Sequence, residues 1–333
     1  WGRLSDRIGR KPIMITGLIG YTVGTVLFTS VFYAGMTGLL SGTLLYVVLL
    51  VTRCSQSTVM SATGPASAAY AADHTSRDER TKTMARLGTA NSMGTILGPA
   101  VSGALATFGL LAPLYFAAAL AAAAAMVVWR KLPMTPDIPH RDRKPSRKLR
   151  YTDKRIALLL VTAVGLFIGF SSIQQTLGFQ LQDKLDLSGI ETAQMTGAAL
   201  LVCATFTFLT QITVMQRLQL RPTQFVRIGL LSMLIGAAVI SGFETFVVLA
   251  VGMAFLGIGM ALCMPSIAAG ASLAVSTEEQ GAAAGLISSC PAIGFAIGPI
   301  CAGGLYQYHT ALAPLFSTGV LVIVLLVLVI NDR

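Results

Sequence analysis

The first 33 residues decide the fold, because a basic stretch is followed at once by an apolar one. Residues 2–12 read GRLSDRIGRKP, and residues 13–33 read IMITGLIGYTVGTVLFTSVFY. The apolar stretch has no charged side chain, and as an α-helix it is about 30 Å long, which matches the hydrocarbon core of a bilayer. Backbone polar groups in lipid must be satisfied internally, so the stretch predicts a membrane-spanning helix.

The rest of the chain repeats this pattern. Of its 333 residues, 54% are hydrophobic and 11% are charged, and the mean hydropathy is +0.72. A soluble domain carries about 25% charged residues, so the composition excludes an ordinary soluble enzyme and a disordered chain. We expect ten spanning helices, near residues 12–33, 38–60 (continuing as helix toward 71), 86–108, 111–129, 156–180, 190–216, 225–241, 245–273, 280–305 and 309–330.

The basic residues predict the orientation of these spans. Alternate loops hold every Lys and Arg except Lys184, which lies in an opposite loop, and Arg53, which lies inside a span. Cytoplasmic loops are rich in Lys and Arg, so the N-terminal loop and the C-terminus are expected in the cytoplasm. The same asymmetry accounts for the net charge of +10 without nucleic acid as a partner. The basic loops are residues 1–11, 72–86, 130–155, 217–227 and 331–333.

An internal repeat relates two parts of the chain at a shift of 200 residues. Between 65–103 and 265–303 the identical residues include the Ser-Glu pair 76/79 with 276/279. Each pair has the spacing of a capping box, which predicts the start of the next helix. Equivalent spans cross in the same direction, as in transporters built from two parallel repeats around a central site. The other identities pair 65, 68, 69, 71, 94, 98, 99 and 103 with 265, 268, 269, 271, 294, 298, 299 and 303.

The proline-containing basic segment 130–155 is expected to link two halves of the fold. Residues 1–129 then form an N-terminal bundle with four spans, and residues 156–333 form a C-terminal bundle with six. If the halves match, two spans precede Trp1, so the sequence is interpreted as a fragment that would not transport alone.

The opening segment resembles the G-x-L-[A/S]-D-R-x-G-R-K motif of the major facilitator superfamily, which lies between the second and third helices of that family. The resemblance implies helices 3–12 of an all-α, twelve-helix fold with two pseudo-symmetric bundles. It also implies that this loop latches one conformation, whereas the alternative is a plain basic turn. Asp6 is expected to pair with Arg10 or to face a helix N-terminus. The implied latch residues are Gly2, Asp6, Arg7, Gly9, Arg10 and Lys11.

A second resemblance concerns the span that contains Arg53. Leu49-x-x-x-Arg53-x-x-Gln56-Ser57 is similar to the family's fourth-helix motif L-x-x-x-R-x-x-Q-G, with Ser57 in place of glycine. A charge at mid-membrane costs about 3 kcal/mol on insertion scales, so it is expected to face a cavity and a partner. We assign proton coupling or substrate binding to Arg53 and Gln56. Snorkelling or a structural salt bridge is the alternative.

A third motif resembles the fifth-helix sequence G-x-x-x-G-P-x-x-G-G of the family's antiporters, with Ser102 in place of one glycine. It comprises Gly94, Gly98, Pro99 and Gly103, and generic helix packing is the alternative. The second copy, from Gly294, is expected to be structural. The charged loop from Asp73 to Arg80 is interpreted as a gate or as simple helix capping.

Polar side chains within the spans are candidates for a central cavity, although each one also suits helix–helix hydrogen bonding. The chosen cavity candidates are Asn91, Gln174 and Gln175. No deep Asp or Glu lies in the ten spans. The family resemblance implies a coupling carboxylate in the first helix, before Trp1, and the alternative is that coupling works in another way.

The resemblance implies a secondary transporter rather than an enzyme, nearest the drug:proton antiporter group that includes tetracycline exporters. We expect a monomer in the bacterial-type inner membrane that exports a small amphipathic molecule against protons, without a catalytic residue, metal or cofactor. Alternatives are a proton-linked importer of a metabolite, a siderophore exporter and, more remotely, a receptor or scaffold that transports nothing.

Overall fold

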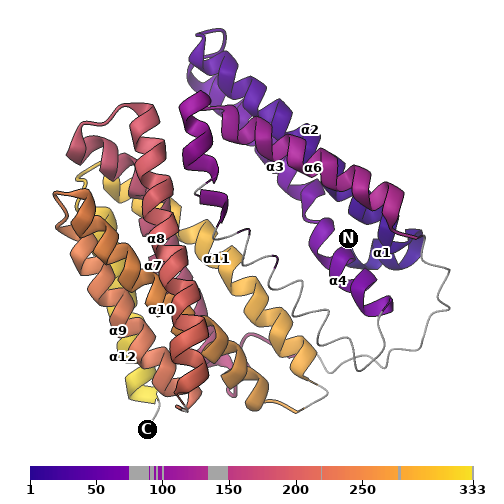
Figure 1. The fold of residues 1–333 in the computed structure, drawn as a ribbon. Coiled ribbons are helices and arrows are strands. Elements are labelled where there is room, and N and C mark those ends of the chain that lie inside the picture. Colours follow the sequence, from indigo (N-terminus) through magenta and orange to yellow (C-terminus); the bar gives the residue numbers. More distant parts are fainter. Residues whose placement is uncertain are drawn as a thin grey trace. The chain divides into compact units, whose positions relative to one another are not determined.

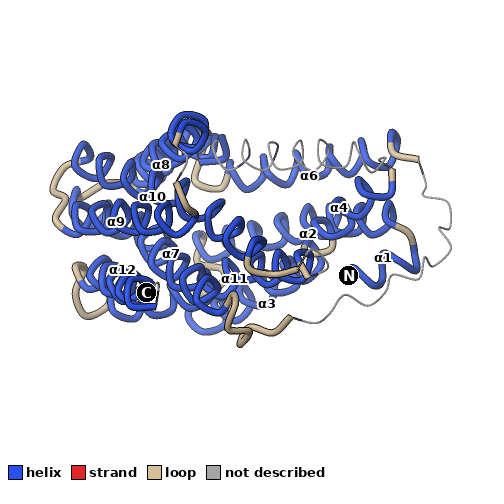
Figure 2. Tube along the Cα trace, turned by 90° about the horizontal axis from the view of Figure 1, so that it is seen from below, coloured by secondary structure: helices blue, strands red, loops and turns tan. Residues whose placement is uncertain are grey.

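The computed structural model describes residues 1–74, 90, 94, 97–99, 101–133, 149–218, 220–276 and 279–331. Throughout this described part the elements are helices joined by loops, with no strand (Figure 2). Contacts divide the chain into two compact units, Trp1–Asp142 and Arg143–Arg333. The division falls within the segment that was predicted as the linker.

The first unit contains five described α-helices and a short 3₁₀ helix (Figure 1). They are α1 (Gly2–Ile8), α2 (Arg10–Met36), α3 (Gly42–Met60), α4 (Thr63–Asp73), η1 (Ala106–Phe108) and α6 (Ala112–Lys131). The second unit contains six described helices: α7 (Ala157–Leu185), α8 (Gly189–Arg217), α9 (Pro222–Ser241), α10 (Phe246–Leu273), α11 (Gln280–Tyr306) and α12 (Leu312–Asn331).

Within the described residues, nine helical stretches are long and apolar enough to cross a membrane, with α3 and α4 counted together as Gly42–Ala71. They coincide with nine of the ten expected spans. The tenth, 86–108, lies largely outside the described residues, and a shorter apolar helix covers Leu97–Phe108.

The expected continuous helix from 38 toward 71 is interrupted. The α3 helix ends at Met60 and α4 begins at Thr63. Pro65 has no backbone N–H to donate toward the carbonyl of Ser61, and proline is tolerated in the first turn of a helix. The break therefore lies where the proline removes a rung of the hydrogen-bond ladder.

Glycines set the close approach of α2 to α3 and α4. A Cβ built on Gly20 would lie 2.1 Å from Cγ1 of Val59, and one on Gly17 would lie 2.2 Å from Oγ1 of Thr63. Small residues at this spacing let helix backbones come together. The α2 helix thus meets α3 and α4 along a line of glycines, where a side chain larger than that of glycine does not fit.

The second unit has the larger buried core, to which α7 to α12 all contribute. Where α9 crosses α10, a glycine of each helix faces a glycine of the other. A Cβ on Gly229 would lie 2.9 Å from the carbonyl oxygen of Gly259, and a Cβ on Gly259 would lie 2.6 Å from that of Gly229. The α7 helix is joined to both neighbours by hydroxyl groups. Ser171 donates to the Gly294 carbonyl at 2.9 Å, and Ser317 of α12 donates to the Gly169 carbonyl at 2.6 Å.

Candidate functional site

The Arg53 side chain lies on α3 and is exposed on the surface of its own unit. Its Nη1 donates to Oε1 of Gln56 at 2.7 Å, three residues along the same helix. Its Cζ lies 5.5 Å from the centre of the Phe28 ring of α2, within the range of a cation–π interaction. One hydrogen bond and one aromatic face therefore hold the guanidinium.

Gln56 links the Arg53 side chain to the interior of the unit. The residue is 2% exposed, and its Nε2 donates to Oγ1 of Thr25 on α2 at 2.5 Å. A Cβ on Gly24 would lie 2.6 Å from Cβ of Gln56, so only glycine allows α2 this close. The predicted pair of Arg53 and Gln56 is thus one hydrogen-bonded group, anchored on a second helix that the sequence did not indicate.

Among the described residues, no carboxylate lies within ion-pair distance of Arg53. The alternative of a structural salt bridge therefore has no support from the described part of the chain. A guanidinium carries five N–H donors, and within the described residues one of them has a protein acceptor.

The opening segment folds as α1, a sharp turn and the start of α2. Gly9 has φ +103°, which L side chains rarely adopt, so this turn favours glycine. Beyond the turn, Arg10 donates through Nη1 to Oγ of Ser5 at 2.7 Å and through Nε to Oδ2 of Asp73 at 3.0 Å. Asp73, interpreted above as a gate or cap residue, is thus an ion-pair partner of Arg10 at the end of α4.

Lys11 joins the same region to α6. It is largely buried, and its Nζ donates to the Trp129 carbonyl at 2.7 Å in the last turn of α6. Arg7 is exposed and Gly2 begins α1, whereas the Asp6 side chain lies outside the described residues. Three helices of the first unit therefore meet at Arg10 and Lys11.

The two copies of the glycine-proline motif differ in packing. Cβ atoms built on Gly94, Gly98 and Gly103 would find no described atom within 4 Å. By contrast, Cβ atoms on Gly294 and Gly298 would collide with α7, at 2.3 Å from Phe167 and 2.2 Å from Ser171 respectively. The structural role expected for the second copy agrees with this contact. Pro99 of the first copy lies in a helix, and the resemblance of that copy to the antiporter motif stays a prediction.

The cavity candidates in α7 differ in burial. Gln174 is half-buried, and its Oε1 is buried with no hydrogen-bond partner among the described residues, whereas Gln175 is exposed. Asn91 lies outside the described residues. Gln180, which sequence reasoning passed over, is fully buried and bonds Thr176.

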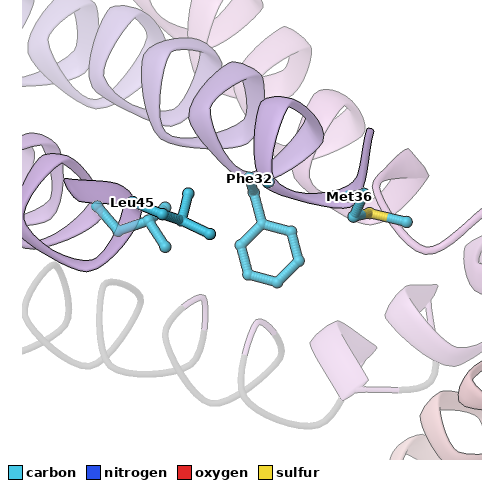
Figure 3. A pocket seen from close by; sticks show the side chains of 5 residues that line it. Phe32, Met36 and Leu45 are labelled. Carbon is cyan, nitrogen blue, oxygen red and sulfur yellow. The ribbon is translucent and has the colours of Figure 1, made fainter. Parts of the chain in front are cut away.

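An apolar pocket of about 220 Å³ lies between α2 and α3 (Figure 3). All of its lining side chains are apolar, so it offers no group for a proton or an ion. Nothing in it identifies an occupant. Its walls are Phe32, Gly35, Met36, Leu45 and Leu49.

A cluster that sequence reasoning missed joins the starts of α7 and α11. Arg155 Nη2 donates to Asp153 at 2.8 Å, and its Nη1 donates to Glu279 at 2.9 Å. The hydrogen bonds from Arg155 lower the pKa of Asp153 and of Glu279 to about 2 each, and both carboxylates raise the pKa of Arg155. Charges separated by 124 residues left no local signal in the sequence.

The expected capping box at the start of α11 is only half formed. Glu279 accepts from the backbone N–H of Ser276 at 3.3 Å, but the Ser276 hydroxyl donates to the same carboxylate at 3.1 Å instead of accepting from a helix N–H. The α11 helix begins at Gln280 with Glu279 as its N-cap, so Glu279 does not occupy the N3 position that a capping box requires. A complete capping box forms instead at Ser188 and Glu191. The corresponding Ser76 and Glu79 lie outside the described residues.

Solved structures share this fold at low sequence identity. The nucleoside transporter NupG aligns with a TM-score of 0.76 at 16% identity, over 100% of this chain and 86% of that one. A bacterial homolog of the human lysosomal transporter Spinster gives a TM-score of 0.74 at 13% identity, over 100% and 84% of the two chains.

Curated relatives extend over most of the chain. Multidrug resistance protein 2 of Bacillus subtilis (strain 168) is 26% identical over 337 residues, which cover 97% of this chain and 79% of that protein. The class D tetracycline resistance protein of Salmonella ordonez is 30% identical over 176 residues, which cover 51% of this chain and 40% of that protein. The sequence also matches the Major Facilitator Superfamily over residues 1–290 and again over 221–333. The chain therefore belongs to the Major Facilitator Superfamily and has the helical membrane-transporter fold of that family.

Proposed function

We propose that the protein is a proton-coupled secondary transporter that exports small amphipathic compounds by alternating access. Relatives named for multidrug and tetracycline resistance support export and the substrate class. The observation that carries the proposal is the guanidinium of Arg53, held within a spanning stretch by Gln56 and Phe28.

Arg53 acts in this proposal as a fixed positive charge. A guanidinium does not release its proton at physiological pH, so it cannot carry the transported proton itself. It lowers the pKa of any carboxylate that approaches it, and a change in their distance makes that carboxylate gain or lose a proton. Coupling follows if proton and drug favour opposite conformations of the protein.

The contacts of Arg10 supply a latch for one of these conformations. The pair with Asp73 joins the start of α2 to the end of α4, and the Gly9 turn fixes the approach of α1. We place this region, the basic linker 130–155 and the C-terminus on the cytoplasmic side of an inner membrane, with the protein as a monomer. The basic loops support that orientation.

Everted membrane vesicles test the proposal directly. With the native full-length protein, acidifying the lumen should drive ethidium or tetracycline into the vesicles, and an uncoupler should abolish this accumulation. Vesicles that lack the protein provide the background. Uptake by right-side-out vesicles instead would favour an importer, and no flux of either probe in either orientation would contradict the proposal for this substrate class.

A further inference from the structure

We propose that Thr25 and Phe28 of α2 are positioning residues for Arg53, and that they set how strongly transport is coupled to protons. The inference rests on the proposed function, because it assigns to Arg53 a role in coupling. It adds two residues of a neighbouring helix to that role. Neither residue belongs to a motif that the sequence analysis identified.

The hydrogen bonds among Thr25, Gln56 and Arg53 have only one possible direction. A guanidinium has donors and no acceptor, so Gln56 must present its carbonyl oxygen to Arg53. Its amide nitrogen then faces Oγ1 of Thr25, which must accept. Arg53 therefore fixes the orientation of the Gln56 amide, and Thr25 holds that amide in place by accepting from its nitrogen. We call this chain of contacts the relay.

Burial makes the relay specific. Thr25 and Gln56 are each 2% exposed, so neither side chain has solvent as a substitute partner. The contact of Gly24 with Cβ and Cγ of Gln56 leaves the glutamine side chain little room to turn. If Thr25 loses its hydroxyl, the buried Gln56 amide nitrogen loses its acceptor, and the Gln56 side chain is no longer anchored to α2 beside Arg53.

Phe28 makes a second contact with the guanidinium. Its ring lies one helical turn beyond Thr25 on α2 and 5.5 Å from Cζ of Arg53. The relay bonds one edge of the planar group while the ring attracts its charge, so the two contacts limit different movements. Both come from α2, and a shift of α2 against α3 would therefore move the charge of Arg53.

Four variants separate positioning from folding. Thr25→Val removes the hydroxyl acceptor at nearly constant volume, whereas the conservative change Thr25→Ser keeps it. Phe28→Leu removes the aromatic ring, whereas the conservative change Phe28→Tyr keeps one. Thr22→Val is the matched control, because the Thr22 hydroxyl bonds only the Leu18 carbonyl of its own helix among the described residues.

The readout is the ratio of pH-driven ethidium accumulation to energy-independent ethidium counterflow, measured with the native full-length protein. A loss of folded protein lowers both rates together, whereas a positioning defect lowers the ratio. We expect Thr25→Val to lower the ratio about fivefold or more, the size of a lost buried hydrogen bond. Phe28→Leu should lower it about threefold or more, the size of a lost cation–π contact at an exposed site. Thr25→Ser, Phe28→Tyr and Thr22→Val should remain within about twofold of wild type.

A second measurement ties the effect to the relay. In a Gln56→Leu background, Thr25→Val should lower the ratio no further, because the bond it removes is already absent. The inference is overturned if Thr25→Val matches Thr22→Val, or if its effect is unchanged in the Gln56→Leu background. Absence of pH-driven accumulation in the wild type would overturn the proposed function itself, so the two failures are distinguishable.

Discussion

Arg10 and Asp73 form an ion pair of 3.0 Å between the first turn of α2 and the last residue of α4, although 63 residues separate them in the chain. Their side chains are 13% and 16% exposed. At this degree of burial the pair is only partly screened by water. Removing one partner leaves the other charge poorly solvated.

Neutralising Asp73 should therefore destabilise the first unit. We expect Asp73→Asn to lower the free energy of unfolding by about 2 kcal/mol, between the values typical of exposed and of buried pairs. Thermal unfolding of the purified protein in detergent measures the change. The matched control is Arg7→Gln, which removes an exposed charge of the same segment and should cost about 0.5 kcal/mol or less. Equal losses in the two variants would show that the pair contributes nothing.

The α9–α10 crossing should not tolerate a methyl group. In Gly259→Ala the new Cβ would lie 2.2 Å from Cγ of Met233 and 2.6 Å from the Gly229 carbonyl oxygen. The helices must separate, and overpacking of this kind costs about 1–3 kcal/mol. Gly303→Ala, where no described atom lies within 4 Å, should instead be neutral or slightly stabilising. Thermal unfolding that ranks the two variants in the opposite order would contradict this packing.

The cluster of Arg155, Asp153 and Glu279 predicts an acid-dependent contribution to stability. The pKa values of both carboxylates in the folded protein are about 2, below the value of about 4 expected in the unfolded chain. Their contribution is therefore fully present above about pH 5 and is lost as the pH falls toward 2. Glu279→Gln should melt below wild type at neutral pH, and the gap should close on acidification. A difference in melting temperature between wild type and Glu279→Gln that grows on acidification would contradict this prediction.

Much of this architecture was predictable because the bilayer constrains it so strongly. An apolar run such as 156–180 has few alternatives to a spanning helix, and α7 indeed covers Ala157–Leu185. The positive φ of Gly9 and the contact between Arg53 and Gln56 are local, and both lie within short motifs that the sequence showed. The break between α3 and α4 also had a local cause, Pro65, but the continuous apolar stretch around it predicted an unbroken helix.

Contacts between helices were not predictable from a single sequence. The pairing of Arg10 with Asp73 and that of Arg155 with Glu279 depend on how distant segments cross. Thr25 carried no signal either, because threonines recur along α2 and only the crossing with α3 selects one of them. The apolar stretches therefore predicted which helices form. The close approach of helices at glycines, such as Gly24 against Gln56, determines which side chains meet.

The most direct test of the central claim is pH-driven ethidium accumulation in everted vesicles that contain the native full-length protein with Arg53→Ala. The account predicts that accumulation falls to the level seen with an uncoupler, while the variant inserts into the membrane at wild-type amounts and still catalyses counterflow. Accumulation at the wild-type rate would remove Arg53 from the coupling mechanism and contradict the account.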